Sequence, residues 1–236
     1  FDLNISFNVI NIILPVGISF YTFQTLSYSI DVYRNKINPT SNLISFLSFV
    51  SFFPQLVAGP IERASNLIPQ IESKRSINVD QFKAGFFQIL VGLFRKIVIA
   101  DNLALYVDLI YEDPQIYNSS TLLLATFLYS FQIYFDFSGY SDIAIGTAKL
   151  LGFNFKQNFN LPYFSNSLTE FWRKWHISLS SWLKDYLYIS LGGNRKGKLL
   201  TYRNLILTML LGGLWHGSSW NFIIWGLIHG FVLAIE

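Results

Sequence analysis

Long hydrophobic runs separated by short polar segments are the main feature of this chain. The hydrophobic runs cover residues 5–30, 43–57, 121–152, 205–217 and 220–235. A helix needs about 20 apolar residues to cross the hydrocarbon core of a bilayer, so the longer runs predict membrane-spanning helices. The run at residues 43–57 is shorter, and we expect a re-entrant or tilted element there. Pro15 and Gly17 predict a kink or break within the first run.

The segments between these runs differ in character. Residues 31–36 and 61–81 are polar, and we expect them to connect apolar elements. Residues 82–111 mix apolar and charged side chains, which predicts an amphipathic helix that leads into a span. Residues 154–167 predict a polar loop rich in aromatic side chains. The basic turn at residues 192–198 predicts a cytoplasmic position, because Lys and Arg concentrate in cytoplasmic loops.

The clearest helix signal covers residues 167–191. Ser167 and Glu170 have the spacing of a capping box, in which each residue satisfies a free backbone amide of the other. Apolar side chains then recur at helical spacing, while basic and polar side chains occupy the opposite face. With three tryptophans on the apolar side, this pattern predicts an amphipathic helix at the membrane interface. Burial of the same face inside a helix bundle is the alternative.

The composition supports a membrane protein with several spans. Of the 236 residues, 52% are hydrophobic and 13% are charged, whereas a typical soluble domain carries about 25% charged residues. The net charge of +3 is small, and its Lys and Arg lie between apolar runs, which indicates membrane topology rather than nucleic-acid binding. The sequence has no cysteine, which excludes disulfides, thiolate zinc sites and a cysteine nucleophile from this segment.

Because the sequence starts at Phe1 and stops directly after an apolar run, we expect residues 1–236 to be one domain, incomplete at both ends, of a longer protein.

A histidine next to a tryptophan within an apolar run is the strongest functional signal. His216 lies between Trp215 and Gly217 in the run at residues 205–217. An ionisable side chain at membrane depth costs roughly 2.5 kcal/mol or more when charged, so it tends to face a protein-lined or water-filled cavity. A neutral imidazole in such a cavity can act as a general base toward an attacking hydroxyl. The alternative is a structural imidazole that is hydrogen-bonded inside a helix bundle.

The other two histidines of the chain are His176 and His229. His176 lies beside the apolar stripe of residues 167–191 and is able to point inward. His229 follows His216 by thirteen residues, which is roughly 220° around a straight helix, so these two would not share a face. A zinc pair is therefore not expected, and the sequence has neither an HExxH motif nor cysteine ligands to support one.

Three acidic residues and one glycine-rich turn are further candidate sites. Asp136 and Asp142 project to different helix faces, so we expect them to contact neighbouring helices or orient a polar cavity rather than act as a carboxylate pair. For Asp101 we likewise expect a contact with a neighbouring helix or a role in orienting a polar cavity. Residues 192–198 match the front of a phosphate-binding loop, but Leu199 stands where Ser or Thr would hold magnesium. Nucleotide hydrolysis is not expected, although a phosphate-bearing donor such as a coenzyme remains a candidate ligand of this turn.

Six stretches of the chain resemble the membrane-bound O-acyltransferases, and in particular the bacterial branch that includes the membrane component of alginate O-acetylation. They cover residues 15–24, 53–61, 134–142, 169–180, 185–197 and 212–217. The resemblance implies an all-α, multi-pass bundle of transmembrane helices in the inner (cytoplasmic) membrane, with re-entrant and interfacial helices around a tunnel. It places the family's catalytic histidine on His216 and its second motif histidine on His176. The residues that we expect to support the tunnel are Asp136, Asp142, Trp175, Trp215 and Asp101.

The resemblance also implies the chemistry. The family brings an acyl donor from the cytoplasm to an acceptor on the outer face, so we expect acetyl-CoA or another acyl thioester as a substrate, with no bound cofactor and no metal. The expected acceptor is a hydroxyl of a cell-envelope polysaccharide such as alginate. Expected partners are membrane lipids and a periplasmic or extracellular acetyltransferase that completes the transfer; no nucleic acid is expected.

Three alternatives stay open at this point. D-alanyl transfer to teichoic acid and acyl transfer to peptidoglycan belong to the same family, although the turn at residues 191–197 is more similar to the polysaccharide branch. A proton-coupled transporter would also place Asp and His within the membrane. A scaffold that recruits partner enzymes is the third alternative, and its histidines would be structural.

Overall fold

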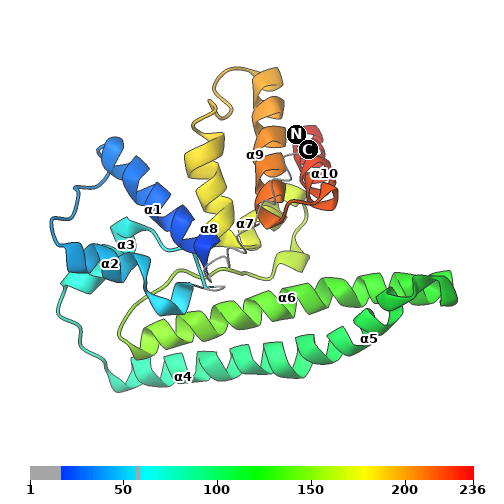
Figure 1. Cartoon of the computed structure of the whole chain (residues 1–236), viewed down its shortest axis with the longest axis horizontal. Coiled ribbons are helices and arrows are strands. Elements are labelled where there is room, and N and C mark those ends of the chain that lie inside the picture. Colours follow the sequence, from blue (N-terminus) through cyan, green and yellow to red (C-terminus); the bar gives the residue numbers. More distant parts are fainter. Residues whose placement is uncertain (1–16, 57–58) are drawn as a thin grey trace, which may run out of the picture.

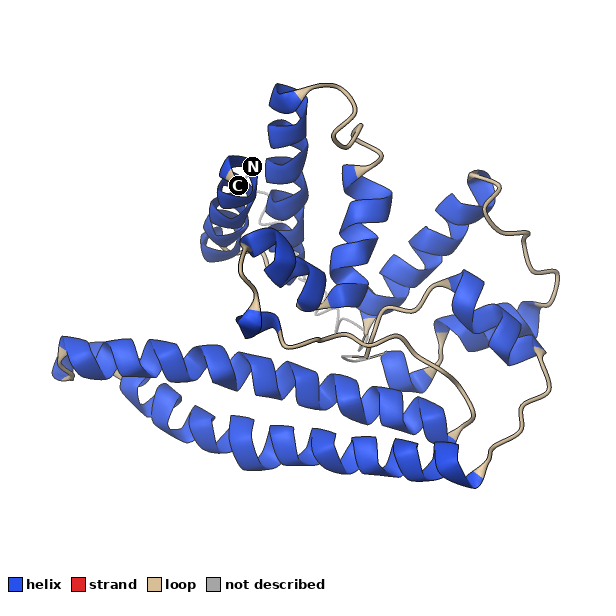
Figure 2. Ribbon diagram, turned by 180° about the vertical axis from the view of Figure 1, so that it is seen from behind, coloured by secondary structure: helices blue, strands red, loops and turns tan. Residues whose placement is uncertain are grey.

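The computed structural model describes residues 17–56 and 59–236, and within these ranges all regular structure is helical. The expected all-α class is therefore confirmed. The helices form two layers (Figure 1). A long hairpin makes the lower layer, and shorter helices stand on it in the upper layer, as the view from behind also shows (Figure 2).

The lower layer is one antiparallel helical hairpin. Its first arm consists of α4 (Val79–Leu93), the π-helical segment η2 (Phe94–Ala100) and α5 (Asp101–Glu112), which follow one another directly. The short turn η3 (Pro114–Ile116) leads to the second arm, α6 (Ser119–Leu150). The prediction of a helix at residues 82–111 is confirmed as this first arm, whereas its predicted lead into a membrane span stays a prediction.

Two pairs of glycines bring α4 and α6 close together. A Cβ atom added at Gly92 would lie 2.6 Å from the carbonyl oxygen of Gly139, and one added at Gly85 would lie 2.9 Å from that of Gly146. Both pairs are seven residues apart on their helices, so they mark two successive contact points. Small residues at such points allow helix backbones to approach closely, as is common between membrane helices.

The upper layer has three parts. One side contains α1 (Ile18–Tyr33), α2 (Leu43–Val50), the turn η1 (Phe53–Gln55) and α3 (Ala64–Glu72). The centre contains the turn η4 (Pro162–Phe164), α7 (Leu168–Lys174), α8 (Ile177–Trp182) and the π-helical segment η5 (Leu183–Tyr188). The other side is the hairpin of α9 (Lys198–His216) and α10 (Trp220–Ile235).

The long apolar runs correspond to helices of the structure. The run at residues 121–152 is α6, and those at 205–217 and 220–235 are the last part of α9 and the whole of α10. The predicted kink near Pro15 lies outside the described residues, and α1 begins directly after Gly17. Among the described residues, no helix combines the length and the hydropathy that crossing a bilayer requires.

The prediction that residues 61–81 form only a polar connection is wrong. They contain α3 and the start of α4. Leu67 and Ile68 on α3 pack into a core cluster with Phe49 of α2 and Phe153. Three apolar side chains per two turns are enough to bury one face of a helix. The segment therefore forms a short amphipathic helix although many of its residues are charged.

The prediction of one continuous helix at residues 167–191 is also wrong. Half of the expected capping box forms at its start, because the Ser167 hydroxyl accepts a hydrogen bond from the Glu170 amide at 3.1 Å. The Glu170 carboxylate accepts one from the Asn166 amide rather than from the Ser167 amide. The helix ends at Lys174, and the chain resumes as α8 after His176, whose backbone is left-handed (φ 42°, ψ 54°). Trp182 is 6% exposed and donates a hydrogen bond to the carbonyl oxygen of Phe23. Trp182 is therefore buried inside the helix bundle, which is the alternative to the interfacial position that the sequence predicted.

Lys96→Ala is expected to destabilise the lower hairpin by about 1 kcal/mol or less, because its two ion pairs are partly exposed to solvent. The ammonium of Lys96 lies 2.5 Å from Asp101 and 2.7 Å from Asp136. The midpoint of thermal unfolding of the full-length protein in detergent measures the loss. Lys83→Ala, at an exposed lysine of α4, is the control, and an equal drop in both variants would contradict the assignment.

Candidate active site

His216 is the last residue of α9 and lies at the turn that connects α9 to α10. Gly217 follows it, and a Cβ atom at that position would lie 2.6 Å from Cε2 of Phe222, so glycine is needed for the Phe222 ring to cover the turn. The Phe222 ring stacks on the His216 imidazole, with 6.0 Å between ring centroids. Ser219 then begins α10 by accepting a hydrogen bond from the Asn221 amide. The turn thus fixes His216 from its C-terminal side.

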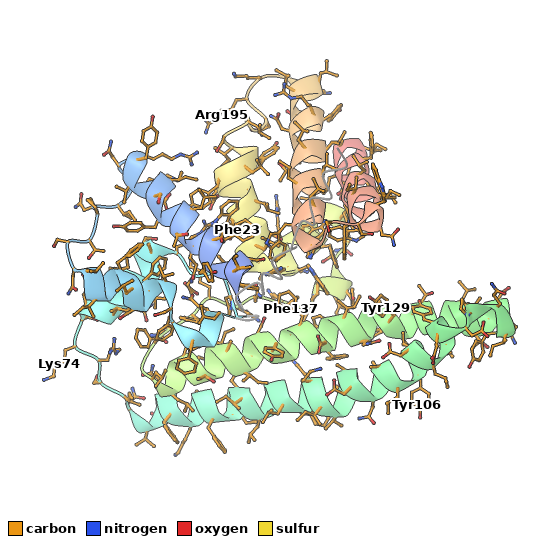
Figure 3. The ribbon with its side chains drawn as sticks, viewed as in Figure 1. Phe23, Lys74, Tyr106, Tyr129, Phe137 and Arg195 are labelled. Atoms are coloured by element: carbon orange, nitrogen blue, oxygen red, sulfur yellow. The ribbon has the colours of Figure 1, made fainter. Side chains whose placement is uncertain are left out.

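His176 lies at the break between α7 and α8. Its side chain is buried, with 2% exposure, and its imidazole meets the ring of Phe137 edge-on at a centroid distance of 4.6 Å. Figure 3 labels Phe137 on the side of α6 that faces the upper layer. Nε2 of His176 is buried and has no hydrogen-bond partner among the described residues. Burial, and secondly the nearby His216, lower the pKa of His176, so its imidazole is neutral.

Trp215 lies between these two histidines. Its ring centroid is 4.9 Å from that of His216 and 6.3 Å from that of His176. On another side it packs against Phe20 and Phe23 of α1, and Figure 3 labels Phe23 where α1 approaches the central helices. The structure therefore brings together three of the residues that the sequence singled out, from α9 and from the α7–α8 break.

Trp175 belongs to an aromatic cluster at the junction of the two layers. Its ring stacks on Phe171 at 5.5 Å and meets Phe159 edge-on at 5.1 Å. Tyr134 of α6 and Tyr163 complete the cluster. This cluster adjoins His176, because Phe159 also contacts Phe137.

Two cavities meet at His216. The first, of about 300 Å³, lies between Trp215, His216 and residues 17–20 at the start of α1. The second, of about 440 Å³, separates α7, α8 and η5 from α9 and α10, and its wall includes His216, Trp225, Arg173 and Lys184. His216 lines both cavities, and its side chain is exposed to them. Its imidazole is therefore accessible from two directions.

The structure corrects the predicted relation between His216 and His229. The prediction assumed one straight helix, but the turn after Gly217 folds α10 back along α9. As a result both imidazoles contact Trp225, at centroid distances of 5.3 Å for His216 and 4.8 Å for His229. Within the part of the chain that the structure describes, no group of three His, Asp or Glu side chains is arranged to hold a metal ion.

Asp142 connects the two arms of the lower hairpin, as predicted for a contact with a neighbouring helix. Its carboxylate accepts one hydrogen bond from the guanidinium of Arg95 and another, at 3.0 Å, from the side-chain Nε2 of Gln88. It also lines a polar cavity of about 70 Å³, together with Ser138 and Asn158. This cavity lies on the α6 side of the loop that leads to α7.

Asp136 and Asp101 share one partner, the ammonium of Lys96. Asp136 thus makes the expected contact with a neighbouring segment. Neither aspartate lines the two cavities that His216 borders. A tunnel role for these two residues stays a prediction.

Two adjacent charged residues that the sequence analysis did not select, Glu62 and Arg63, contact the loop before α7 and the segment after α8. Glu62 is 1% exposed and accepts a hydrogen bond from the Lys156 amide at 2.7 Å, and burial raises the pKa of its carboxyl group. Arg63 donates to Asp185 at 3.2 Å and lies over the Tyr186 ring, and burial lowers the pKa of its guanidinium. The available signal was a Glu-Arg pair that directly follows an apolar stretch.

Comparison with known proteins identifies relatives over most of the chain. Residues 37–236 match the membrane-bound O-acyltransferase family. The chain is 54% identical to a probable alginate O-acetylase of Azotobacter vinelandii, over 98% of this chain and 46% of that protein. It is 42% identical to a peptidoglycan O-acetyltransferase of Helicobacter pylori, over 98% and 49%, and 30% identical to a teichoic acid D-alanyltransferase of Bacillus subtilis, over 95% and 59%. The chain therefore spans about half the length of these relatives.

Proposed function

This chain belongs to the membrane-bound O-acyltransferase family, and on that basis we propose that it is part of an enzyme that moves an acetyl group from a thioester towards a hydroxyl of a cell-envelope polysaccharide. The identity is higher with the probable alginate O-acetylase than with the peptidoglycan or teichoic acid enzymes. An alginate-type polysaccharide is therefore the acceptor that we propose first.

One observation carries the proposal: His216 borders two separate cavities. A hydroxyl in one cavity and a thioester in the other could both reach the same imidazole. The neutral imidazole takes the hydroxyl proton while the hydroxyl oxygen attacks the carbonyl carbon of the thioester. The new C–O bond forms, the C–S bond breaks, and the departing thiolate receives the proton from the imidazolium. The protein itself is unchanged at the end of the cycle.

The larger cavity suits the donor. It runs along α9 from His216 toward Leu205 and Tyr188, and the basic turn at residues 192–198 lies beyond that end. From Arg203 to His216 the helix rises about 20 Å, at 1.5 Å per residue. A thioester on a long arm that ends in phosphate, such as that of a coenzyme, would place its sulfur near His216 and its charge near the basic side chains.

His176 has a different role in this proposal. Its imidazole is neutral and its Nε2 has no partner within the described residues. A buried polar atom without a partner costs about 1–3 kcal/mol, and a bound substrate would remove that cost. We therefore assign to His176 a hydrogen bond that positions or polarises the donor or the acceptor hydroxyl.

We also propose that the chain lies in the inner membrane and crosses it several times. Large apolar side chains are largely exposed along the outer face of the lower hairpin and on α2, including Phe87, Leu105, Leu123 and Ile44. Lipid is the surrounding that such side chains favour. The ester that forms at His216 would then be taken over by a periplasmic or extracellular acetyltransferase, which completes the transfer of the acetyl group to the polymer.

A strain that lacks the complete gene is expected to lose O-acetyl groups from one envelope polymer, and the full-length gene should restore them. Mass analysis of exopolysaccharide, peptidoglycan and teichoic acid from the same cultures measures the loss and identifies the acceptor. Unchanged acylation of all three polymers would contradict the proposal. Proton-driven solute uptake by vesicles that contain the protein, with no acyl product, would favour a transporter instead.

A further inference from the structure

Asn158 is fully buried between the two layers and hydrogen-bonds to both of them. Its side-chain Nδ2 donates to the hydroxyl of Ser141 on α6 at 3.1 Å. Its Oδ1 accepts hydrogen bonds from the amide and the hydroxyl of Ser178 on α8, at 3.2 and 2.9 Å. Its backbone carbonyl accepts a hydrogen bond from the amide of Ile177 at 2.9 Å.

These bonds surround His176, which has the least favourable backbone of the site. The left-handed conformation of His176 (φ 42°, ψ 54°) is disfavoured for any residue that carries a side chain. The two amides that follow it, of Ile177 and Ser178, are both held by Asn158. Fixing both amides fixes the direction in which the chain leaves His176.

Local sequence preference works against this conformation. The apolar spacing of residues 167–191 favours one continuous helix, in which His176 would be right-handed. Asn158 competes with that helix, because its oxygen atoms occupy the amides at the start of α8. In a continuous helix the imidazole would point in another direction and leave its place between Phe137 and Trp215.

The loop that carries Asn158 is itself anchored at both ends of its buried part. Upstream, Glu62 accepts a hydrogen bond from the Lys156 amide, and the side chain of Gln70 accepts one from the Asn154 amide. Downstream, Phe159 is 6% exposed and packs against Phe137. The loop that carries Asn158 is thus anchored by contacts with Glu62, with α3, with α6 and, through the Asn160 amide and the Lys174 carbonyl oxygen, with the end of α7.

We propose that Asn158 is a positioning residue for His176. It holds the left-handed break between α7 and α8, so that the imidazole stays buried between Phe137 and Trp215. The effect on catalysis rests on the function proposed above, whereas the effect on the His176 ring does not.

Kinetics of the full-length protein in membranes test the first part. Asn158→Ala should lower kcat by about 10- to 100-fold and change the donor KM by about twofold or less. In a His176→Ala background the same change should cause no further loss, because residues that act as one unit are not additive. Asn158→Asp, which keeps an oxygen for Ser178, should recover most of the rate. Losses that multiply in the double variant would overturn the proposal.

Chemical modification tests the second part without any need for activity. Diethyl pyrocarbonate, with peptide mass spectrometry, should modify exposed His216 in every variant that retains it and buried His176 only weakly in the wild type. Asn158→Ala should raise the modification of His176 by about fivefold or more. If that variant does not accumulate, Ser178→Ala should give a smaller rise in the same direction. Unchanged modification of His176 would overturn the proposal, and absence of acyl transfer by the wild type would instead overturn the proposed function.

Discussion

His216→Ala is expected to abolish acyl transfer while the protein accumulates normally. Removing a general base typically lowers a rate by about 10²- to 10⁴-fold, and no other described residue lines both cavities. The substitution should preserve the fold, because His216 is an exposed residue at the end of α9 and Ala is the most favourable residue for a helix. The measurement is the O-acetyl content of the polymer, with the protein level in membranes determined in parallel.

Leu214→Ala is the matched control for this experiment. Leu214 lies two residues before His216 on the same helix, is 41% exposed and lines neither cavity. It should retain polymer acetylation at the wild-type level. His216→Gln keeps a polar side chain of similar length but no basic nitrogen, so it should be as inactive as His216→Ala. Full acetylation in either His216 variant would remove this residue from the catalytic role.

The sequence was sufficient to locate the longest helices and the central histidine. α6, α9 and α10 agree with apolar runs, because long runs of this kind have few alternatives to a buried or lipid-facing helix. His216 could be selected because an ionisable side chain in such a run has few structural explanations. Trp215 could be selected with it, because the two residues belong to the same short motif, Trp215-His216-Gly217.

The parts that were missed depend on contacts between residues far apart in the chain. The break at His176 is held by Asn158, eighteen positions earlier, and Asn158 is placed in turn by Glu62 through the amide of Lys156. Periodicity reports only which face of a helix is apolar, so it favours an unbroken helix wherever the apolar spacing continues. The prediction that His216 and His229 lie on different faces of one helix was wrong for a similar reason. A three-residue turn between them reverses the direction of the chain.

These long-range contacts also explain why the two motif histidines lie close together although forty residues separate them. His216 is positioned by the turn between α9 and α10, and Phe222 covers that turn. His176 is positioned by a loop that is anchored on α3 through Gln70 and on α6 through Ser141. Trp215 fills the space between the two rings. The site is therefore assembled from separate supports, and each support can be changed without changing the histidines themselves.

Ser181→Phe is expected to raise the KM for the thioester donor by about tenfold, or ~1.4 kcal/mol of binding free energy. Ser181 lies on α8 and lines the cavity of about 440 Å³ between α8 and α9. A phenyl ring at this position would occupy space in the cavity that the donor needs. The rate at saturating donor should fall much less than the rate at low donor. Initial rates with a labelled thioester in isolated membranes measure both quantities.

Ser29→Phe makes the same chemical change at an exposed position of α1 that lines neither cavity, so it separates blockage from a general effect of the larger side chain. It should leave the donor KM unchanged. If Ser181→Phe also leaves the donor KM unchanged, the donor does not pass between α8 and α9. The smaller cavity beside residues 17–20 would then be the route by which the thioester reaches His216, and the hydroxyl would have to enter from the side of α8.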